Sequence, residues 1–451
     1  MSIGIPVLLA LGFSSQLRLG ISCVVLRSKV MIGGRFKVAS VASIAAAGLF
    51  MGGVSAQAAD LGGNCCADLE ERVAELEATT ARKGNRKVSL EVSGHVHEAL
   101  LIWDDGRDQE AYILTSNYSR TRFRFKGAAK INADWSAGFL IEIGLRQTGN
   151  SSGADQSGNA NGGLDIRHQA LYVKSKSLGT LWMGHTSFAV DGIADICLGC
   201  SISSSHESSL GWGGFETRFS GSATEFGPSW SQLGAGNNVA SNGARDQIIR
   251  YISPSLAGFV FSADWQAAEV ANDGDRWSAA LRYAGEFGGI RVAAGIGYHE
   301  EDDLDGWGTS LSVMHTPTGL FIAGSYGEQT DDSIAVGLED TTDGWSVVGG
   351  VAGKWSSMGK TTLWVRYGEY TGRNLEATAA IASVGGIAVG DNLSGDSEII
   401  SFGVNQKIDA AAMELYASYY NVQGDISNAT AGTTLSPEDF QAVMLGARIQ
   451  F

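Results

Sequence analysis

The sequence predicts an all-β fold, a 16-stranded antiparallel transmembrane β-barrel that follows a short N-terminal helical, coiled-coil-like segment. Three observations predict it. Apolar and polar residues alternate with period two through residues 87–451, and the connections between these segments are short and long in turn. The composition, with 61 Gly and 18% charged residues, is also unlike that of a soluble helical protein, in which roughly 25% are charged.

Residues 1–58 have the features of a secretory leader, whose start codon is either Met1 or Met31. From Met31, a basic stretch with Arg35 and Lys37 precedes an apolar core at residues 38–54. A small-residue cleavage site ends at Ala58. No later apolar run reaches the 18 residues of a membrane-spanning helix, so the exported protein is either soluble or a β-barrel.

The acidic charge of the mature chain limits its partners. Residues 1–58 hold five of the 32 Lys and Arg and none of the 48 Asp and Glu, so a chain starting at Ala59 has a formal net charge of −21. This charge disfavours nucleic acid as a partner. It favours a weak preference for cations in any channel that the chain forms.

The segment 59–86 contains the one convincing helix pattern, which we expect in the periplasm. Between residues 65 and 82, a short heptad seam is formed by Leu69, Val73 and Leu76. A helix this short is marginal alone, so we expect several copies to bundle, which favours a homotrimer. The alternative is a helix lying on the protein's own surface.

The alternating segments are each about 10–12 residues long, as a tilted strand needs to cross the hydrocarbon layer. Seven short turns and eight long loops separate them, which gives 16 strands. A soluble sandwich has no reason to keep every second connection short, whereas an outer-membrane barrel has short periplasmic turns and long external loops. Aromatic residues near strand ends fit interfacial girdles, and they are Trp103, Trp277, Tyr283, Tyr298, Trp307, Trp345, Trp355 and Tyr367.

No arrangement of residues indicates catalysis or a bound cofactor, and we expect no enzyme activity. The acidic external loops are either a solvated face or weak sites for divalent cations that bridge to lipopolysaccharide. Cys197 and Cys200 could form a loop disulfide, remain free thiols or provide half of a metal site. The disulfide is favoured because an exported protein lies in an oxidising compartment.

Three stretches resemble alphaproteobacterial general porins: the run CCADLEERVAELEATTARKGNRKVSLEVSGHV from Cys65, the run YISPSLAGF from Tyr251, and the terminal Phe451. The resemblance covers residues 60–451. It implies a trimeric 16-stranded diffusion channel in the outer membrane of a Gram-negative bacterium, with a third external loop that folds into the pore. Phe451 closes an alternating strand, which resembles the signal read by the outer-membrane assembly machinery. Some family members have a disulfide-closed segment before the first strand, which we do not transfer to Cys65 and Cys66.

The third external loop, about 188–245, is far longer than a hairpin needs, and such loops are usually functional or disordered. If it folds inward, it brings acidic residues towards the lumen: Asp191, Asp195, Glu207 and Glu216. The opposite wall is basic, with Arg120, Arg122, Arg124, Lys126, Arg146, Arg167 and Arg448. These groups predict a transverse field at a constriction that small hydrophilic solutes and ions cross by passive diffusion. One alternative is that the arginines only pair with lumen carboxylates, and another is a substrate-specific or adhesin-like barrel.

Overall fold

The computed structural model describes residues 87–146, 154–158, 163–204, 214–219, 226–236, 245–266, 275–378 and 386–451. The predicted leader, residues 1–58, and the predicted helical segment 59–86, with Leu69, Val73 and Leu76, lie outside these residues. Within them, the helical structure is the short 3-10 helix η2, Asp409–Ala411. No helix in this part of the chain is long and apolar enough to span a membrane.

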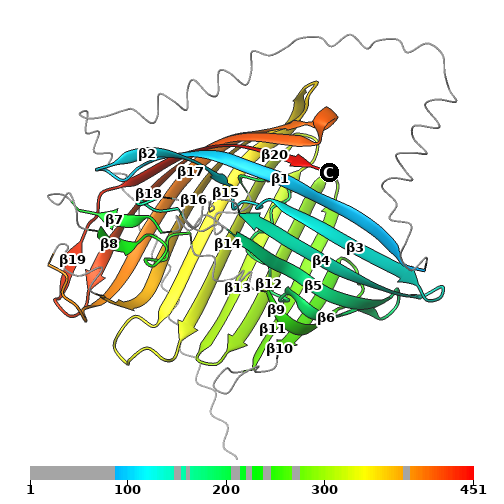
Figure 1. The fold of residues 1–451 in the computed structure, drawn as a ribbon, viewed down its shortest axis with the longest axis horizontal. Helices are drawn as coiled ribbons and strands as arrows, with labels where there is room; N and C mark the ends of the chain where they lie inside the picture. The colour runs from blue at the N-terminus through cyan, green and yellow to red at the C-terminus, as the bar shows by residue number, and fades with distance from the viewer. Residues whose placement is uncertain are drawn as a thin grey trace, which may run out of the picture. The chain divides into compact units, whose positions relative to one another are not determined.

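The described residues form a closed antiparallel sheet (Figure 1). Its strands are β1 Ser89–Asp104, β2 Gln109–Thr115, β3 Arg122–Lys130, β4 Trp135–Arg146, β5 Gly163–Ser175, β6 Gly179–Ser187, β9 Arg245–Ile252, β10 Phe259–Gln266, β11 Arg276–Phe287, β12 Ile290–Glu301, β13 Leu304–His315, β14 Leu320–Asp331, β15 Thr341–Ser356, β16 Gly359–Glu376, β17 Asn392–Ile408, β18 Met413–Asn428, β19 Thr433–Leu435 and β20 Phe440–Gln450. Pairing of β1 with β20, in which Leu100 lies opposite Leu445, closes the sheet.

The wall has 16 strands, as the sequence predicts, because β2 and β3 are two parts of one wall strand, as are β19 and β20. Successive connections alternate between two ends of the barrel: one end, the turn end, has only short connections, and the other, the loop end, has the long connections together with the two-residue connection 302–303 between β12 and β13. Three expected loops are wrong in extent. Those at 104–118 and 422–439 are shorter because β2 and β19 continue the wall into them, and that at 300–306 is reduced to residues 302–303 because β12 and β13 extend into it.

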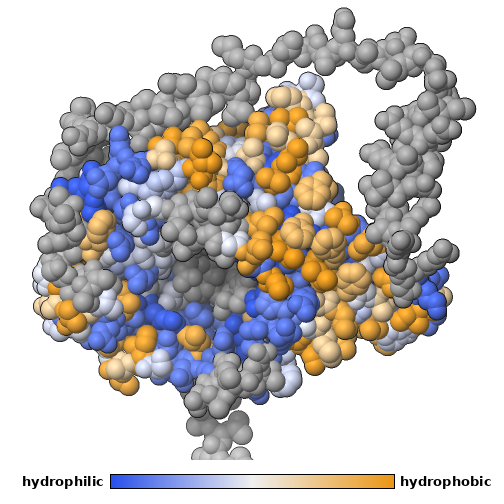
Figure 2. All heavy atoms as spheres, in the orientation of Figure 1, coloured by the Kyte–Doolittle hydropathy of each residue, from blue (hydrophilic) through white to orange (hydrophobic). Residues whose placement is uncertain are grey.

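Period-two alternation separates the two faces of the wall. Outward positions are apolar and exposed, as at Leu311 and Ile322, and hydrophobic side chains gather over β3 to β6 on the face in Figure 2. Outward aromatic rings pair across neighbouring strands towards the loop end, at Trp277–Tyr298, Trp307–Tyr326 and Trp345–Tyr367. These pairs match the predicted girdle. Trp103 does not, because it points inward and is 1% exposed.

The second wall strand breaks between β2 and β3, where residues 116–121 turn into the barrel. The Tyr118 hydroxyl lies 3.2 Å from that of Ser418 on β18, and the Tyr416 hydroxyl donates to Ser116 at 2.9 Å. In the wall, the Thr121 hydroxyl takes the place of the missing ladder partner, because the His97 N–H donates to it at 2.9 Å. Side-chain hydrogen bonds therefore satisfy backbone groups where the ladder is interrupted.

The described parts of the connection after β6, which we call loop three, lie against the inner face of the wall. Residues 188–204 contact β10, β13, β17 and β18; the Leu198 N–H, for example, donates to Ser312 at 3.0 Å. The hairpin β7 Glu216–Arg218 and β8 Phe226–Ser229, with residues 230–236, packs near the loop end.

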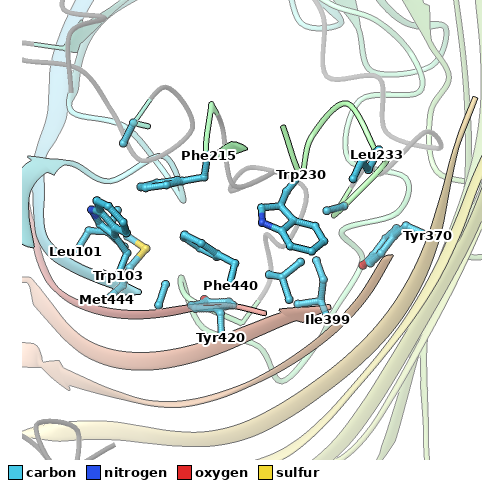
Figure 3. Close-up of a cluster of buried hydrophobic side chains, with 14 of the residues drawn as sticks. Leu101, Trp103, Phe215, Trp230, Leu233, Tyr370, Ile399, Tyr420, Phe440 and Met444 are labelled. Atoms are coloured by element: carbon cyan, nitrogen blue, oxygen red, sulfur yellow. The ribbon is translucent and has the colours of Figure 1, made fainter. Parts of the chain in front are cut away.

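A buried apolar cluster joins this hairpin to the wall (Figure 3). The Phe215 ring lies 5.1 Å from Trp103 and 4.7 Å from Phe440, centroid to centroid. Trp230 and Leu233, each 1% exposed, belong to the same cluster. Burial of these apolar groups provides the driving force that keeps loop three inside the barrel.

Candidate functional site

Glu142 on β4 is the centre of a charged cluster on the inner wall. Its side chain is 0% exposed, and it lies directly opposite Arg124 in the register of β3 and β4. Oε1 accepts from Arg122 at 3.1 Å and from Arg167 at 2.8 Å, and Oε2 accepts from Arg124 Nε at 2.7 Å. Three guanidinium groups thus share one carboxylate, and charge-assisted hydrogen bonds of this kind are the stronger ones.

The positions of two predicted cations, Arg167 and Arg120, do not follow from simple alternation along a strand. The β4–β5 register shifts between Glu142 and Ile143, and this bulge turns Arg167 towards Glu142. Arg120 lies in the inward turn at 116–121 and not on β3, contrary to the alternation from Arg120 to Lys126. Its guanidinium nevertheless forms an ion pair with Asp165 on β5, at 2.7 Å.

Sequence reasoning missed Arg245, the first residue of β9. It forms an ion pair with Asp191 at 3.6 Å, so this acidic residue of loop three lies beside the basic wall. The sequence places Arg245 at the end of the long loop at about 188–245, and only the start of the alternating run at β9 indicates that it belongs to the wall. The role of Glu142 could have been inferred from the sequence, because Glu142 alternates with the apolar residues of β4.

We call the following residues the basic arc: Arg120, Arg122, Arg124, Lys126, Arg167 and Arg245.

The remaining predicted basic residues have different settings. Lys126 lies on the same face of β3 as Arg124, is exposed, and forms no ion pair within the described residues. Arg448 on β20 is farther along the wall and pairs with Glu414 at 3.0 Å. Arg146 is the last residue of β4, and the structure does not describe its side chain.

The predicted acidic residues of loop three do not form one group. Asp195 is half-buried in the segment 188–204, and Glu207 lies outside the described residues. Glu216 lies in β7, where its N–H donates to Gln156 Oε1 at 3.0 Å. Burial, with the nearby Asp155 carboxylate, raises the pKa of Glu216 above its ordinary value. The expectation of a single acidic face is therefore wrong for Glu216, because the β7–β8 hairpin packs near the loop end.

Arginines also hold loop three to the wall on the side of β9 and β11. Arg250 donates to the Ser187 carbonyl at 2.6 Å, and Arg282 donates to the Asp191 carbonyl at 2.7 Å. Arg276 lies over the Phe188 ring at 3.7 Å. Backbone carbonyls of loop three thus accept hydrogen bonds from guanidinium groups of the wall.

Cys197 and Cys200 form a disulfide in the loop segment, with their Cα atoms 5.4 Å apart. Gly199 lies between them against Phe321 of β14, where a Cβ would be 2.1 Å from the ring. A side chain at Gly199 would therefore move the loop away from the wall. Among the described residues, no group of His, Cys, Asp and Glu could hold a metal ion.

Comparisons with known proteins agree with this architecture. OmpT, an outer membrane protein of Vibrio cholerae, is 15% identical and matches with a TM-score of 0.50 over 82% of this chain and 99% of that chain. The anion-selective porin from Comamonas acidovorans is 16% identical, with a TM-score of 0.50 over 81% of this chain and 100% of that chain. At such identities these matches support the fold alone, and no curated protein matches significantly in sequence.

A sequence model of the Gram-negative porin family matches residues 39–427, which is most of the chain. That family locates the protein in the bacterial outer membrane. The closed barrel, its apolar outer face and its charged inner face are what such a location requires. The chain therefore belongs to the Gram-negative porin family of outer-membrane channel proteins.

Proposed function

We propose that the protein is a general porin, a water-filled channel through which small hydrophilic solutes and ions cross the outer membrane by passive diffusion. The observation that carries this proposal is the inner wall, where arginines, lysines and carboxylates line a closed barrel whose outer face is apolar. Charged groups on an inner wall are stable only where water or counter-charges solvate them.

The constriction lies, on this proposal, between the basic arc and loop three. The arc occupies β3, β5, β9 and the turn at 116–121, whereas residues 198–204 of the loop lie on β13, β17 and β18. Solutes then pass beside the arc, where Arg124, with a side chain 43% exposed, is the most accessible of its paired arginines. Pairing with Glu142, Asp165 and Asp191 also stiffens the wall, so on this proposal the arginines stabilise the wall and line the constriction.

A homotrimer is proposed from the outward face of β1 and β20. Glu98 faces outward between Val96 and Leu100, and its carboxylate accepts from the hydroxyl groups of Thr115 and Thr121 at 3.1 Å. A charged group facing lipid is destabilising, which favours protein contact at this face. The small residues Gly94 and Ala447 lie on the same two strands, whereas Ala279 lies on β11 and does not contribute to this surface.

The finer assignments are proposals as well. They comprise an alphaproteobacterial subfamily, a cleaved leader at residues 1–58, a helical seam at Leu69, Val73 and Leu76, contact with lipopolysaccharide, and recognition of Phe451 by the assembly machinery. The Phe451 backbone pairs with Gly94 at both N–H and C=O, so the terminal residue is part of the closed wall. No catalytic role is proposed for any residue.

Uptake by liposomes tests general diffusion against the alternatives. In vesicles that contain the full-length protein, we expect the rate of entry of small uncharged sugars to rise linearly with concentration and to fall with sugar size. A substrate-specific channel would saturate with one sugar, and an adhesin-like barrel would give no entry. Either result would overturn the proposal.

A further inference from the structure

The basic arc contains more cations than the carboxylates paired with it. Glu142 pairs with Arg122, Arg124 and Arg167, Asp165 pairs with Arg120, and Asp191 pairs with Arg245. Lys126 has no ion pair within the described residues, although Glu91 lies opposite it in the strand register. Even when Glu91 is included, six cations face four carboxylates, and the arc retains positive charge.

Two further cations lie on the adjoining inner wall, where the buried Asp264 on β10 is opposite Arg250 in the strand register. Arg250 and Arg282 donate to loop-three carbonyls, and neither forms an ion pair with a carboxylate in the described ranges. A carbonyl accepts the hydrogen bond and leaves the charge of the guanidinium in place. Asp264 offsets the charge of Arg250, so this part of the wall adds the charge of Arg282 to the excess positive charge of the arc.

Many carboxylates of the chain lie on the outward face of the wall, between the aromatic pairs and the loop end. The Tyr326 hydroxyl donates to Glu328 at 2.8 Å, and the Tyr367 hydroxyl donates to Glu369 at 2.7 Å. Residues of the same outward rows include Glu300, Asp343, Asp396, Glu398 and Asp425. The wall separates these groups from a permeating ion, and salt at about 0.1 M screens charges that lie farther apart than a Debye length of about 10 Å.

We propose that this channel prefers anions, and that small carboxylates and phosphates pass it more readily than cations of similar size. The inference rests on the proposed diffusion function and names its solute class. It reverses the cation preference that the formal net charge of −21 for residues 59–451 favours. The sign follows from the separation of charge by strand alternation, since a solute in a narrow passage responds to the nearest groups and not to the total charge.

The reversal potential of the full-length protein in a planar bilayer tests the proposal. In a potassium chloride gradient with both solutions at or above about 0.1 M, where distant outward charges are screened more than groups beside the ion path, we expect a chloride-to-potassium permeability ratio above one. Replacing both Arg124 and Lys126 by Gln should lower this ratio by about threefold, because two charges close to the ion path are lost. Glu142 keeps two partners in this variant, so the cluster persists.

Lys354→Gln is the matched control, because Lys354 pairs with Asp409 at 3.3 Å at the turn end, away from the arc. It should leave the ratio unchanged. Lys126→Gln alone, at an exposed position, should lower the permeability ratio by a smaller factor. This single variant tests the proposal if the double variant does not fold. Currents that reverse with a cation preference, or a ratio that Lys354→Gln changes as much as Arg124→Gln with Lys126→Gln, overturn the proposal while leaving the diffusion function intact. Absence of any current would instead contradict the diffusion function.

Discussion

At the scale of single residues, the inner wall is organised by carboxylates that each satisfy several cations. Glu142 is fully buried and accepts from three guanidinium groups, so its removal would leave three positive charges without a counter-charge. Breaking such a buried cluster on one side is strongly destabilising. The alternation of residues predicted that Arg122 and Arg124 share a face. It could not predict the position of Arg120, because the inward turn of residues 116–121 depends on hydrogen bonds to β18, such as that between Ser116 and Tyr416, which are 300 residues apart.

Asp134 gives a residue-scale prediction at the turn end. Its carboxylate accepts from the Ser175 hydroxyl at 2.8 Å and from the Lys176 N–H at 3.0 Å, and thereby joins two neighbouring turns at the turn end. The Ser175 hydrogen bond lowers the pKa of Asp134 below its ordinary value. A lowered folded-state pKa gives stability that is present above the unfolded pKa of about 3.9 and is lost as the pH falls through the folded value.

We therefore expect Asp134→Asn to lower the midpoint of thermal unfolding in detergent at pH 7. The difference from the unmodified protein should shrink as the pH falls below about 4, since protonation then has the same effect as the substitution. Ser175→Ala, which removes the donor, should give the same trend. A difference that stays constant between pH 7 and pH 3 would show that the carboxylate charge does not stabilise these turns.

At the scale of elements, loop three packs closely against glycine residues of the wall, and this packing holds it in place. Leu233 lies on Gly395, where a Cβ would be 2.6 Å from its Cδ2, and on Gly372, where a Cβ would be 2.7 Å from its backbone carbon. The length of the loop predicted a functional element. Its path could not be predicted, because it depends on surfaces of β16 and β17 that form only when the barrel closes. For the same reason Trp103, which resembles a girdle residue in sequence, is a buried contact of Phe215.

Leu233→Ala tests whether this packing fixes the loop. Truncation of a buried Leu costs about 2–5 kcal/mol, enough to let residues 226–236 leave the wall part of the time. We expect noisier open-channel currents, with little change in barrel unfolding. Leu363→Ala is the control, because Leu363 lies on the outward face of β16 and is 43% exposed. Equal noise in the two variants would mean that the cluster in Figure 3 does not hold the loop.

At the scale of the whole molecule, the wall strands were predictable because one period governs all of them. A strand that faces lipid on one side and water on the other must alternate, so the pattern repeats around the barrel. The distribution of charge was not predictable from the total. The outward acidic rows at Glu328 and Glu369 and the inward cations at Arg250 and Arg282 contribute to the same sum but lie on opposite sides of the wall.

The central claim is that the closed barrel contains an open aqueous path beside loop three. Single-channel recording of the full-length protein in planar bilayers tests it most directly. We predict stepwise currents that are linear in voltage, rise with salt concentration and close in three equal steps, one for each subunit of the proposed trimer. Folded, membrane-inserted protein that passes no current would contradict the account.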